Sequence, residues 1–193
     1  MMEHVGFAVS AGAAHVLTNL DNLALLTGMM LTLGAPRAVA GFVLSQVIVL
    51  TVSMAVAVGA DQGFTQYAGY LGVVPLVLGL RGILQQFRAP TQSHATSTLS
   101  QSSLLGATAL FLSLSMDSLA VMAPLLADSL PAYRISAVLG AGLAVVGLGG
   151  LGILLSRIAT TFSAVPTRLE TLGPYAMVAV GIYVLLNSGT DVL

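Results

Sequence analysis

The chain lacks cysteine, tryptophan and lysine, and it carries little charge of either sign: only 7% of its 193 residues are charged. Without cysteine it forms no disulfide, no thiolate metal site and no dithiol relay. Soluble domains carry about 25% charged residues, so six arginines and seven acidic residues cannot cover the surface of a soluble globule of this size. Lipid is therefore the expected solvent for most of the surface. The net charge of −1 gives no electrostatic reason to expect a nucleic acid as partner.

Hydrophobic residues make up 56% of the chain and gather in six long stretches. A membrane-spanning helix needs about 20 mostly apolar residues, and the six stretches cover residues 5–33, 38–60, 66–87, 102–127, 134–157 and 171–188. A polar loop rich in Ser, Thr and Gln fills residues 88–103. The sequence therefore predicts an all-α integral membrane protein with six transmembrane helices. Residues 1–87 and 104–193 contribute three each to one membrane domain.

The arginines predict how the chain is oriented. Cytoplasmic loops of membrane proteins carry an excess of basic residues. With the N-terminus outside, only Arg134 lies on the outer side, and the inner side holds Arg37, Arg81, Arg88, Arg157 and Arg168. Both termini are therefore expected on the outer side.

A short segment of the first stretch recurs in the fourth. Asn19-Leu20-Asp21-Asn22-Leu23-Ala24 is similar to Ser115-Met116-Asp117-Ser118-Leu119-Ala120, and a shift of 96 residues superimposes the two aspartates. The third members correspond more loosely, Leu71-Gly72 with Leu172-Gly173 and Gly79-Leu80 with Gly181-Ile182. Because each half has three spans, the second half must enter the membrane from the opposite side. This pattern predicts inverted-topology repeats, which in secondary transporters place the substrate site near the midplane between the repeats.

Asp21 and Asp117 fall well inside their stretches rather than at the ends. An aspartate at the centre of a membrane helix costs roughly 2.5–3.5 kcal/mol on insertion scales. Carboxylates at such positions usually belong to an ion path, a proton relay or a substrate site. The competing interpretation is a pair of protonated aspartates that bond neighbouring helices.

The neighbours of these aspartates supply further oxygen atoms. At about 100° per residue, the polar residues of the first helix cover less than half of its circumference; they are His15, Thr18, Asn19, Asp21 and Asn22. In the fourth helix, Ser113 and Asp117 stand at i, i+4, with Ser115 and Ser118 on the flank. Carboxylate, amide and hydroxyl oxygens suit a dehydrated divalent cation. The candidate metal ligands are therefore Asp21, Asn22, Asp117, Thr18, Asn19 and Ser118.

Three further residues are candidate supplementary ligands, each with a simpler structural interpretation. His15 could bind the ion, carry a proton or make an ordinary helix contact. Gln46, an isolated polar residue of the second stretch, could complete the site or bond a neighbouring helix. The thioether of Met116 would favour softer ions, although methionine in an apolar chain more often serves packing.

Motifs along the chain also carry a family resemblance. They are Thr18-Asn19-Leu20-Asp21-Asn22, Gln46, Leu71-Gly72-Val73-Val74-Pro75 with Leu78-Gly79-Leu80, Asp117-Ser118 followed by Pro124, and Pro174 with Gly181-Ile182-Tyr183. In this order they resemble the cadmium-resistance transporter family of the lysine-exporter superfamily. The resemblance implies efflux of a divalent metal such as cadmium across the bacterial cytoplasmic membrane.

Together these features predict a secondary-active exporter of divalent cations rather than an enzyme. Two carboxylates balance one divalent ion and can instead hold protons, so proton antiport is the expected coupling. No cofactor is expected besides the transported ion and the coupling proton, and homo-oligomerisation is left open.

Three alternatives compete with metal export. The superfamily also implies exporters of small amino acids or related solutes; their carboxylate needs a partner, and every arginine lies at a span end or in a loop. Amides of a broken helix keep this alternative open. A membrane oxidoreductase is disfavoured, because haem or quinone chemistry usually needs paired histidines and a thiol relay needs cysteine. A structural subunit would not need two aspartates at equivalent depths.

Overall fold

The computed structural model of the chain describes residues 2–63, 70–88, 103–158 and 173–187, and every regular element within them is helical. The helices are α1 (Met2–Leu17), α2 (Leu20–Leu33), α3 (Ala35–Gly63), α4 (Val73–Arg88), α5 (Leu104–Leu114), α6 (Met116–Asp128), α7 (Pro131–Ile158) and α9 (Gly173–Asn187). The predicted all-α class is confirmed for these residues. The expected polar loop at 88–103 lies outside the described residues except at its two ends.

Within the described residues, two helices are long and apolar enough to cross a membrane by themselves. They are α3, over its 27 residues Ala35–Asp61, and the 28-residue α7. The pairs α1–α2 and α5–α6 qualify only if each counts as one broken span, and their members are bent by 59° and 61°. Helices α4 and α9 are shorter, with 16 and 15 residues. The described helices are thus compatible with a membrane protein of two to four spans.

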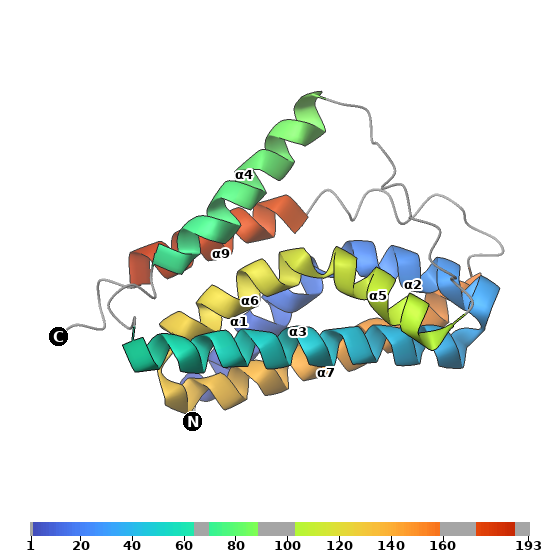
Figure 1. The fold of residues 1–193 in the computed structure, drawn as a ribbon, viewed down its shortest axis with the longest axis horizontal. Coiled ribbons are helices and arrows are strands. Elements are labelled where there is room, and N and C mark those ends of the chain that lie inside the picture. The colour runs from blue at the N-terminus through green and yellow to red at the C-terminus, as the bar shows by residue number, and fades with distance from the viewer. Residues whose placement is uncertain (1, 64–69, 89–102, 159–172, 188–193) are drawn as a thin grey trace.

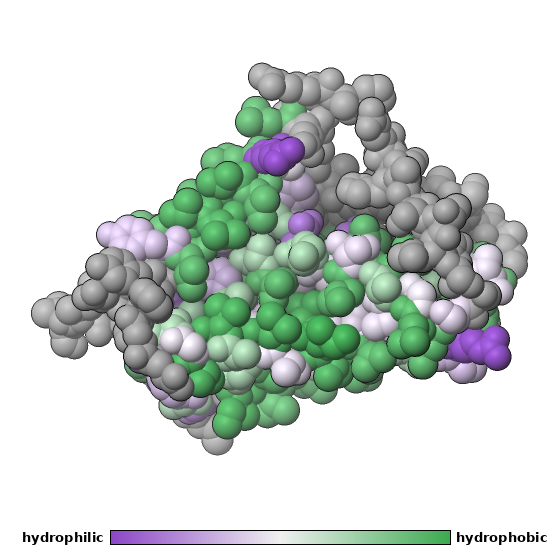
Figure 2. All heavy atoms as spheres, viewed as in Figure 1, coloured by the Kyte–Doolittle hydropathy of each residue, from purple (hydrophilic) through white to green (hydrophobic). Residues whose placement is uncertain are grey.

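Apolar side chains prevail among the described residues on the molecular face shown in Figure 2. On α7, Leu143 and Val146 are 74% and 71% exposed. Such exposure suits a surface that meets lipid, because lipid removes the cost of leaving large apolar side chains outside the core. The expectation of a mainly lipid-facing surface agrees with this distribution.

The long helices α3 and α7 lie side by side and run in opposite directions (Figure 1). Helix α3 packs against α5 and α6, and α7 packs against α1 and α2. Each long helix thus contacts the broken pair of the other half of the chain. Helices α4 and α9 pack on each other as a separate pair set at an angle to the bundle (Figure 1).

Small and aromatic residues form the core between these helices. Phe42 of α3 and Phe111 of α5 meet edge to face, with ring centroids 5.5 Å apart, and both are fully buried. Between α1 and α7 the backbones touch, because a Cβ at Gly140 would overlap the carbonyl oxygen of Ala8. Close approach through small residues is the usual way that helices associate in membranes, where no hydrophobic force drives them together.

A buried arginine ties three helix ends together. Arg134, 4% exposed in the first turn of α7, donates from Nε to the carbonyl oxygen of Leu126 in α6 at 2.8 Å. Its two terminal nitrogens bind both carboxylate oxygens of Asp61 at the end of α3, and the Nη2–Oδ1 distance is 2.8 Å. Arg157 lies at the opposite end of α7, where it is exposed in the last turn.

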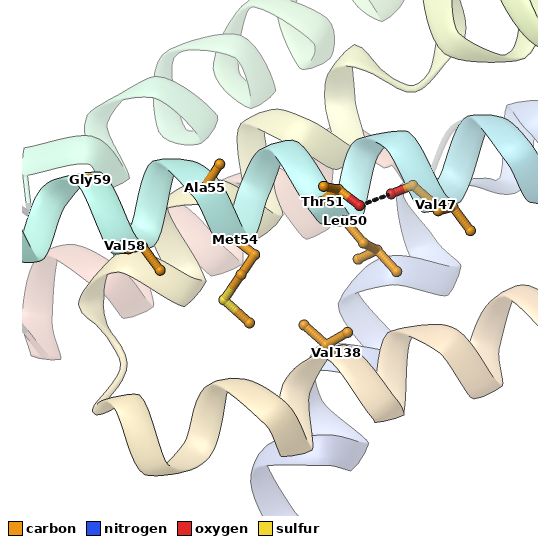
Figure 3. A pocket seen from close by; sticks show the side chains of 8 residues that line it. All are labelled: Val47, Leu50, Thr51, Met54, Ala55, Val58, Gly59 and Val138. Atoms are coloured by element: carbon orange, nitrogen blue, oxygen red, sulfur yellow. Dashed lines mark hydrogen bonds between the residues drawn. The ribbon is translucent and has the colours of Figure 1, made fainter.

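An apolar groove of about 740 Å³ lies on the outer side of α3, beside α7 (Figure 3). Its lining is Val47, Leu50, Thr51, Met54, Ala55, Val58, Gly59 and Val138. The Thr51 hydroxyl donates back to the Val47 carbonyl of its own helix at 2.7 Å, so the polar group is already satisfied. None of the predicted site residues lines the groove, and its chemistry is that of the lipid-facing surface.

We predict that Gly140→Ala destabilises the protein by about 1–3 kcal/mol, because the added methyl group forces α1 and α7 apart. Gly142→Ala is the matched control on the same helix, since a Cβ at Gly142 meets nothing within 4 Å. Thermal unfolding in detergent, followed by circular dichroism, compares the two variants. Equal melting temperatures would contradict the close packing of α1 on α7.

We also predict an asymmetric response at the ion pair. Asp61→Ala leaves Arg134 buried without its counter-charge and should cost about 3 kcal/mol. Arg134→Met should cost less, because the side chain of Asp61 is 35% exposed and can be hydrated when it loses its partner. Arg157→Met serves as the control at an exposed arginine. Unfolding midpoints that rank the two ion-pair variants in the reverse order would contradict this account.

Candidate functional site

The two broken helices are interrupted at the predicted polar segments. Helix α1 ends at Leu17 and α2 begins at Leu20, whereas α5 ends at Leu114 and α6 begins at Met116. Asp21 and Asp117 each occupy the first turn of the helix that follows the break. The shift of 96 residues that superimposes the aspartates therefore superimposes the breaks as well.

Polar side chains stabilise the first break by bonding carbonyl groups of the last turn of α1. The Thr18 hydroxyl donates to the carbonyl oxygen of Ala14 at 3.1 Å, and Nδ2 of Asn19 donates to that of His15 at 2.8 Å. The Ala14 carbonyl also accepts from the backbone amide of Thr18. The His15 carbonyl receives no backbone amide from the described residues and therefore depends on a side-chain partner. Thr and Asn can supply one because their side chains compete with the backbone for hydrogen bonds.

Ser115 stabilises the second break and joins three helices there. Its hydroxyl donates to the carbonyl oxygen of Phe111 at 2.7 Å. The same oxygen accepts from Nδ2 of Asn22 and from Nε2 of Gln46, each at 2.9 Å. Ser115 is fully buried, so α2, α3 and the junction of α5 with α6 meet at one hydroxyl group.

The two breaks are also linked directly and reciprocally. Asn19 donates to Oγ of Ser118 at 2.7 Å, and Asn22 donates to Oγ of Ser115 at 2.9 Å. Under the shift of 96 residues, Asn19 corresponds to Ser115 and Asn22 corresponds to Ser118. Exchanging the two halves of the chain therefore turns one of these hydrogen bonds into the other. Contacts about a twofold axis have this pattern.

The two aspartates lie at the edge of this network. Both are half-buried, whereas the surrounding amides and hydroxyls are almost fully buried. Oδ1 of Asp21 accepts from the backbone amide of Asn22 at 2.8 Å. The N-terminus of a helix carries a partial positive charge, and each carboxylate lies in the first turn of α2 or α6.

Some buried polar atoms of the network have no hydrogen-bond partner among the described residues. They are Oδ1 of Asn22, Oε1 of Gln46 and both ring nitrogens of His15; Oγ of Ser53 on α3 is also without one. The Gln46 side chain faces the His15 ring without reaching hydrogen-bond geometry. An unpaired buried polar group costs about 1–3 kcal/mol, which makes these atoms candidates for binding a ligand.

The structure brings most of the predicted ligands together. Thr18, Asn19, Asn22 and Ser118 form one network with Gln46, and His15 borders it. The side chain of Met116 is 62% exposed and lies outside the network. Among the described residues, no three His, Asp or Glu side chains are close enough together to hold a metal ion by themselves. A cation here would therefore depend on neutral oxygens as well as carboxylates.

Two expectations that assumed unbroken helices were wrong. The polar residues between positions 15 and 22 do not share one helical face, because α1 and α2 are bent by 59° between them. Ser113 and Asp117 do not share an i, i+4 face either, because the 61° break lies between them. The Ser113 hydroxyl instead donates to the carbonyl oxygen of Leu110 at 2.7 Å.

Ser115 is the site residue that the predicted ligand set omitted. The repeat contained a signal for it, since Ser115 is the counterpart of Asn19. Its role depends on the meeting of α2, α3 and α6, which are distant in sequence.

The chain matches no family model, no curated protein and no solved structure. The resemblance to cadmium-resistance transporters therefore stays a prediction. The functional assignment depends on the geometry of the two helix breaks.

Proposed function

We propose that the protein is a secondary-active exporter of divalent metal cations that works by proton antiport. The ion binds between the two helix breaks, where Asp21 and Asp117 supply charge and the amide and hydroxyl groups supply further oxygen atoms. The observation that carries the proposal is the reciprocal pair of hydrogen bonds between the breaks. Discontinuous helices at equivalent positions of two repeats are the usual architecture of a secondary-transporter site.

The reciprocal bonds support two inverted-topology repeats of three spans each. In this arrangement α1–α2, α3 and α4 form the first repeat, and α5–α6, α7 and α9 form the second. The long helices fit it, because each packs against the broken pair of the other repeat. The arginines fit it as well, since Arg134 and Arg157 occupy opposite ends of α7.

The contact between α4 and α9 gives independent support. A Cβ at Gly79 would lie 2.6 Å from the carbonyl oxygen of Pro174, and a Cβ at Gly181 would lie 2.8 Å from that of Gly72. The correspondence of Gly79 with Gly181 is a shift of 102 residues, and the same shift carries Gly72 onto Pro174. The two contacts are therefore exchanged when the repeats are exchanged, as a twofold relation requires.

The proposed coupling follows from the chemistry of the two carboxylates. Each is costly inside a membrane unless it is neutralised. One divalent cation neutralises both carboxylates, and two protons do the same. The cation and the protons therefore compete for one site. Rocking of the repeats about the breaks then exposes the site to each side in turn. We propose a bacterial cytoplasmic membrane as the location, with both termini outside; the expected excess of arginines on the inner side supports this orientation.

Export of small amino acids is the weaker candidate. Half-helix N-termini can bind a substrate carboxylate, but the first turns of α2 and α6 already carry Asp21 and Asp117. The buried guanidinium of Arg134 is engaged by Asp61. An anionic substrate would meet two like charges at the breaks.

We predict that Asp21→Asn and Asp117→Asn each weaken divalent-cation binding more than about tenfold, because the charge of the ligand set governs affinity at oxygen sites. Calorimetric titration of Mn²⁺, Zn²⁺ and Cd²⁺ into the detergent-purified protein measures the change. Asp128→Asn, at the far end of α6, removes the same charge outside the site and should bind as the wild type does. Binding that survives in both site variants would refute the proposed role of the carboxylates.

A further inference from the structure

Resting on the proposed function, we infer that the exported cation is one of the oxygen-coordinated class, such as Mn²⁺, and that the site has no built-in preference for cadmium. The carboxamide oxygens of Asn22 and Gln46 are two of its ligands. They complement the half-buried carboxylates with neutral donors held in a fixed orientation.

The hydrogen bonds of Ser115 fix that orientation. The Ser115 hydroxyl has one hydrogen, which it gives to the carbonyl oxygen of Phe111 at 2.7 Å. It can therefore only accept from its other neighbours. Both carboxamides must then present their NH₂ groups to it, as they do at 2.9 Å.

Further hydrogen bonds prevent the NH₂ group and the carbonyl oxygen of either amide from exchanging places. The second N–H of Asn22 donates to Oδ1 of Asn19 at 2.8 Å, and the amide nitrogen of Gln46 is also 3.4 Å from the hydroxyl of Ser45. An inverted amide would lose these bonds and would place a carbonyl oxygen against the Ser115 oxygen. The chain thus holds Oδ1 of Asn22 and Oε1 of Gln46 away from the Ser115 hydroxyl.

The lone pairs of the two side-chain carbonyl oxygens are therefore available to a bound cation. Both residues are fully buried, and neither oxygen has a partner among the described residues. Because they are attached to α2 and α3 and held by the same serine, they belong to one junction. Dehydrated cations of the Ca²⁺ and Mn²⁺ type use such amide oxygens together with carboxylates.

Soft donors are missing from this junction. The chain has no cysteine, and the methionines nearest in sequence to the two aspartates pack elsewhere. Met29 and Met30 belong to the apolar cluster of α2, α3, α5 and α7, and Met122 belongs to that of α1, α3, α6 and α7. The side chain of Met116 is exposed. Only the imidazole of His15 adds a donor other than oxygen, and imidazole also binds first-row divalent metals.

The test is a calorimetric comparison of Mn²⁺ and Cd²⁺ binding to the purified protein. We expect the two dissociation constants of the wild type to agree within about tenfold, since oxygen ligands do not single out a soft ion. Gln46→Met replaces the amide oxygen by a thioether on a side chain of similar length, and it should shift the ratio toward Cd²⁺ by at least about tenfold. Thr51→Met places the same thioether on the exposed face of α3 and should leave the ratio unchanged.

Gln46→Glu is a second variant that keeps an oxygen ligand and adds charge. The carboxylate cannot donate to Ser115 as the amide does, so the Ser115 hydroxyl must turn its hydrogen toward it from the Phe111 carbonyl, which keeps its bond from the Ser115 backbone amide at 2.9 Å. The added charge should then tighten the binding of both ions by about tenfold without changing their ratio. If the methionine variant does not fold, unchanged or weaker Mn²⁺ binding in folded Gln46→Glu would exclude Gln46 as a ligand.

The remaining outcomes separate this inference from the proposed function. A wild type that binds Cd²⁺ more than about a hundredfold tighter than Mn²⁺ would overturn the oxygen-coordinated class and leave the divalent-cation exporter standing. An unchanged ratio in folded Gln46→Met would exclude Gln46 as a ligand. No saturable heat with either ion would overturn both the inference and the proposed function.

Discussion

The hydrogen bonds that join the two helix breaks are the interaction on which the rest of the site depends. Asn19 bonds Ser118 and Asn22 bonds Ser115, so each half of the chain satisfies the polar groups of the other. In an apolar surrounding, a broken helix is tolerated only where its free backbone groups find partners, and the Ser118 hydroxyl lies 3.3 Å from the carbonyl oxygen of Thr18 across the breaks. The Asn22–Ser115 bond and the bond from Gln46 to the same serine orient the two amides, and they thereby connect the fold to the proposed cation chemistry.

The packing around the breaks fits a protein that keeps its polar groups inside and its apolar groups outside. Large aliphatic side chains of α7 are exposed, whereas the amides and hydroxyls at the breaks are buried. Small residues bring α1 against α7 and α4 against α9, and each contact is close enough to exclude a Cβ. The buried ion pair of Arg134 with Asp61 fastens one end of this bundle. The polar breaks thus lie in a bundle whose contacts between α1 and α7 and between α4 and α9 are closely packed.

The sequence was sufficient for the features that depend on composition and local pattern. The helical class followed from long apolar stretches, and Asn19, Asn22 and Ser118 were identified because polar residues stand out within them. The bends did not follow, because they depend on side-chain bonds to backbone carbonyls, such as that of Asn19 to His15, which the sequence alone does not specify. The central position of Ser115 and the pairing of Asp61 with Arg134 also escaped prediction. Both depend on contacts between helices far apart in sequence.

The most direct test of the account is coupled flux through the purified protein in liposomes. Mn²⁺ entry is followed with an indicator enclosed in the lumen, while a second dye reports lumenal pH under an imposed pH gradient. The account predicts that Mn²⁺ enters only vesicles containing the protein, faster when the lumen is acidic, and that the lumen becomes more alkaline as the metal enters. Absence of protein-dependent Mn²⁺ flux under either direction of the gradient, or Mn²⁺ entry without opposite proton movement, would contradict it.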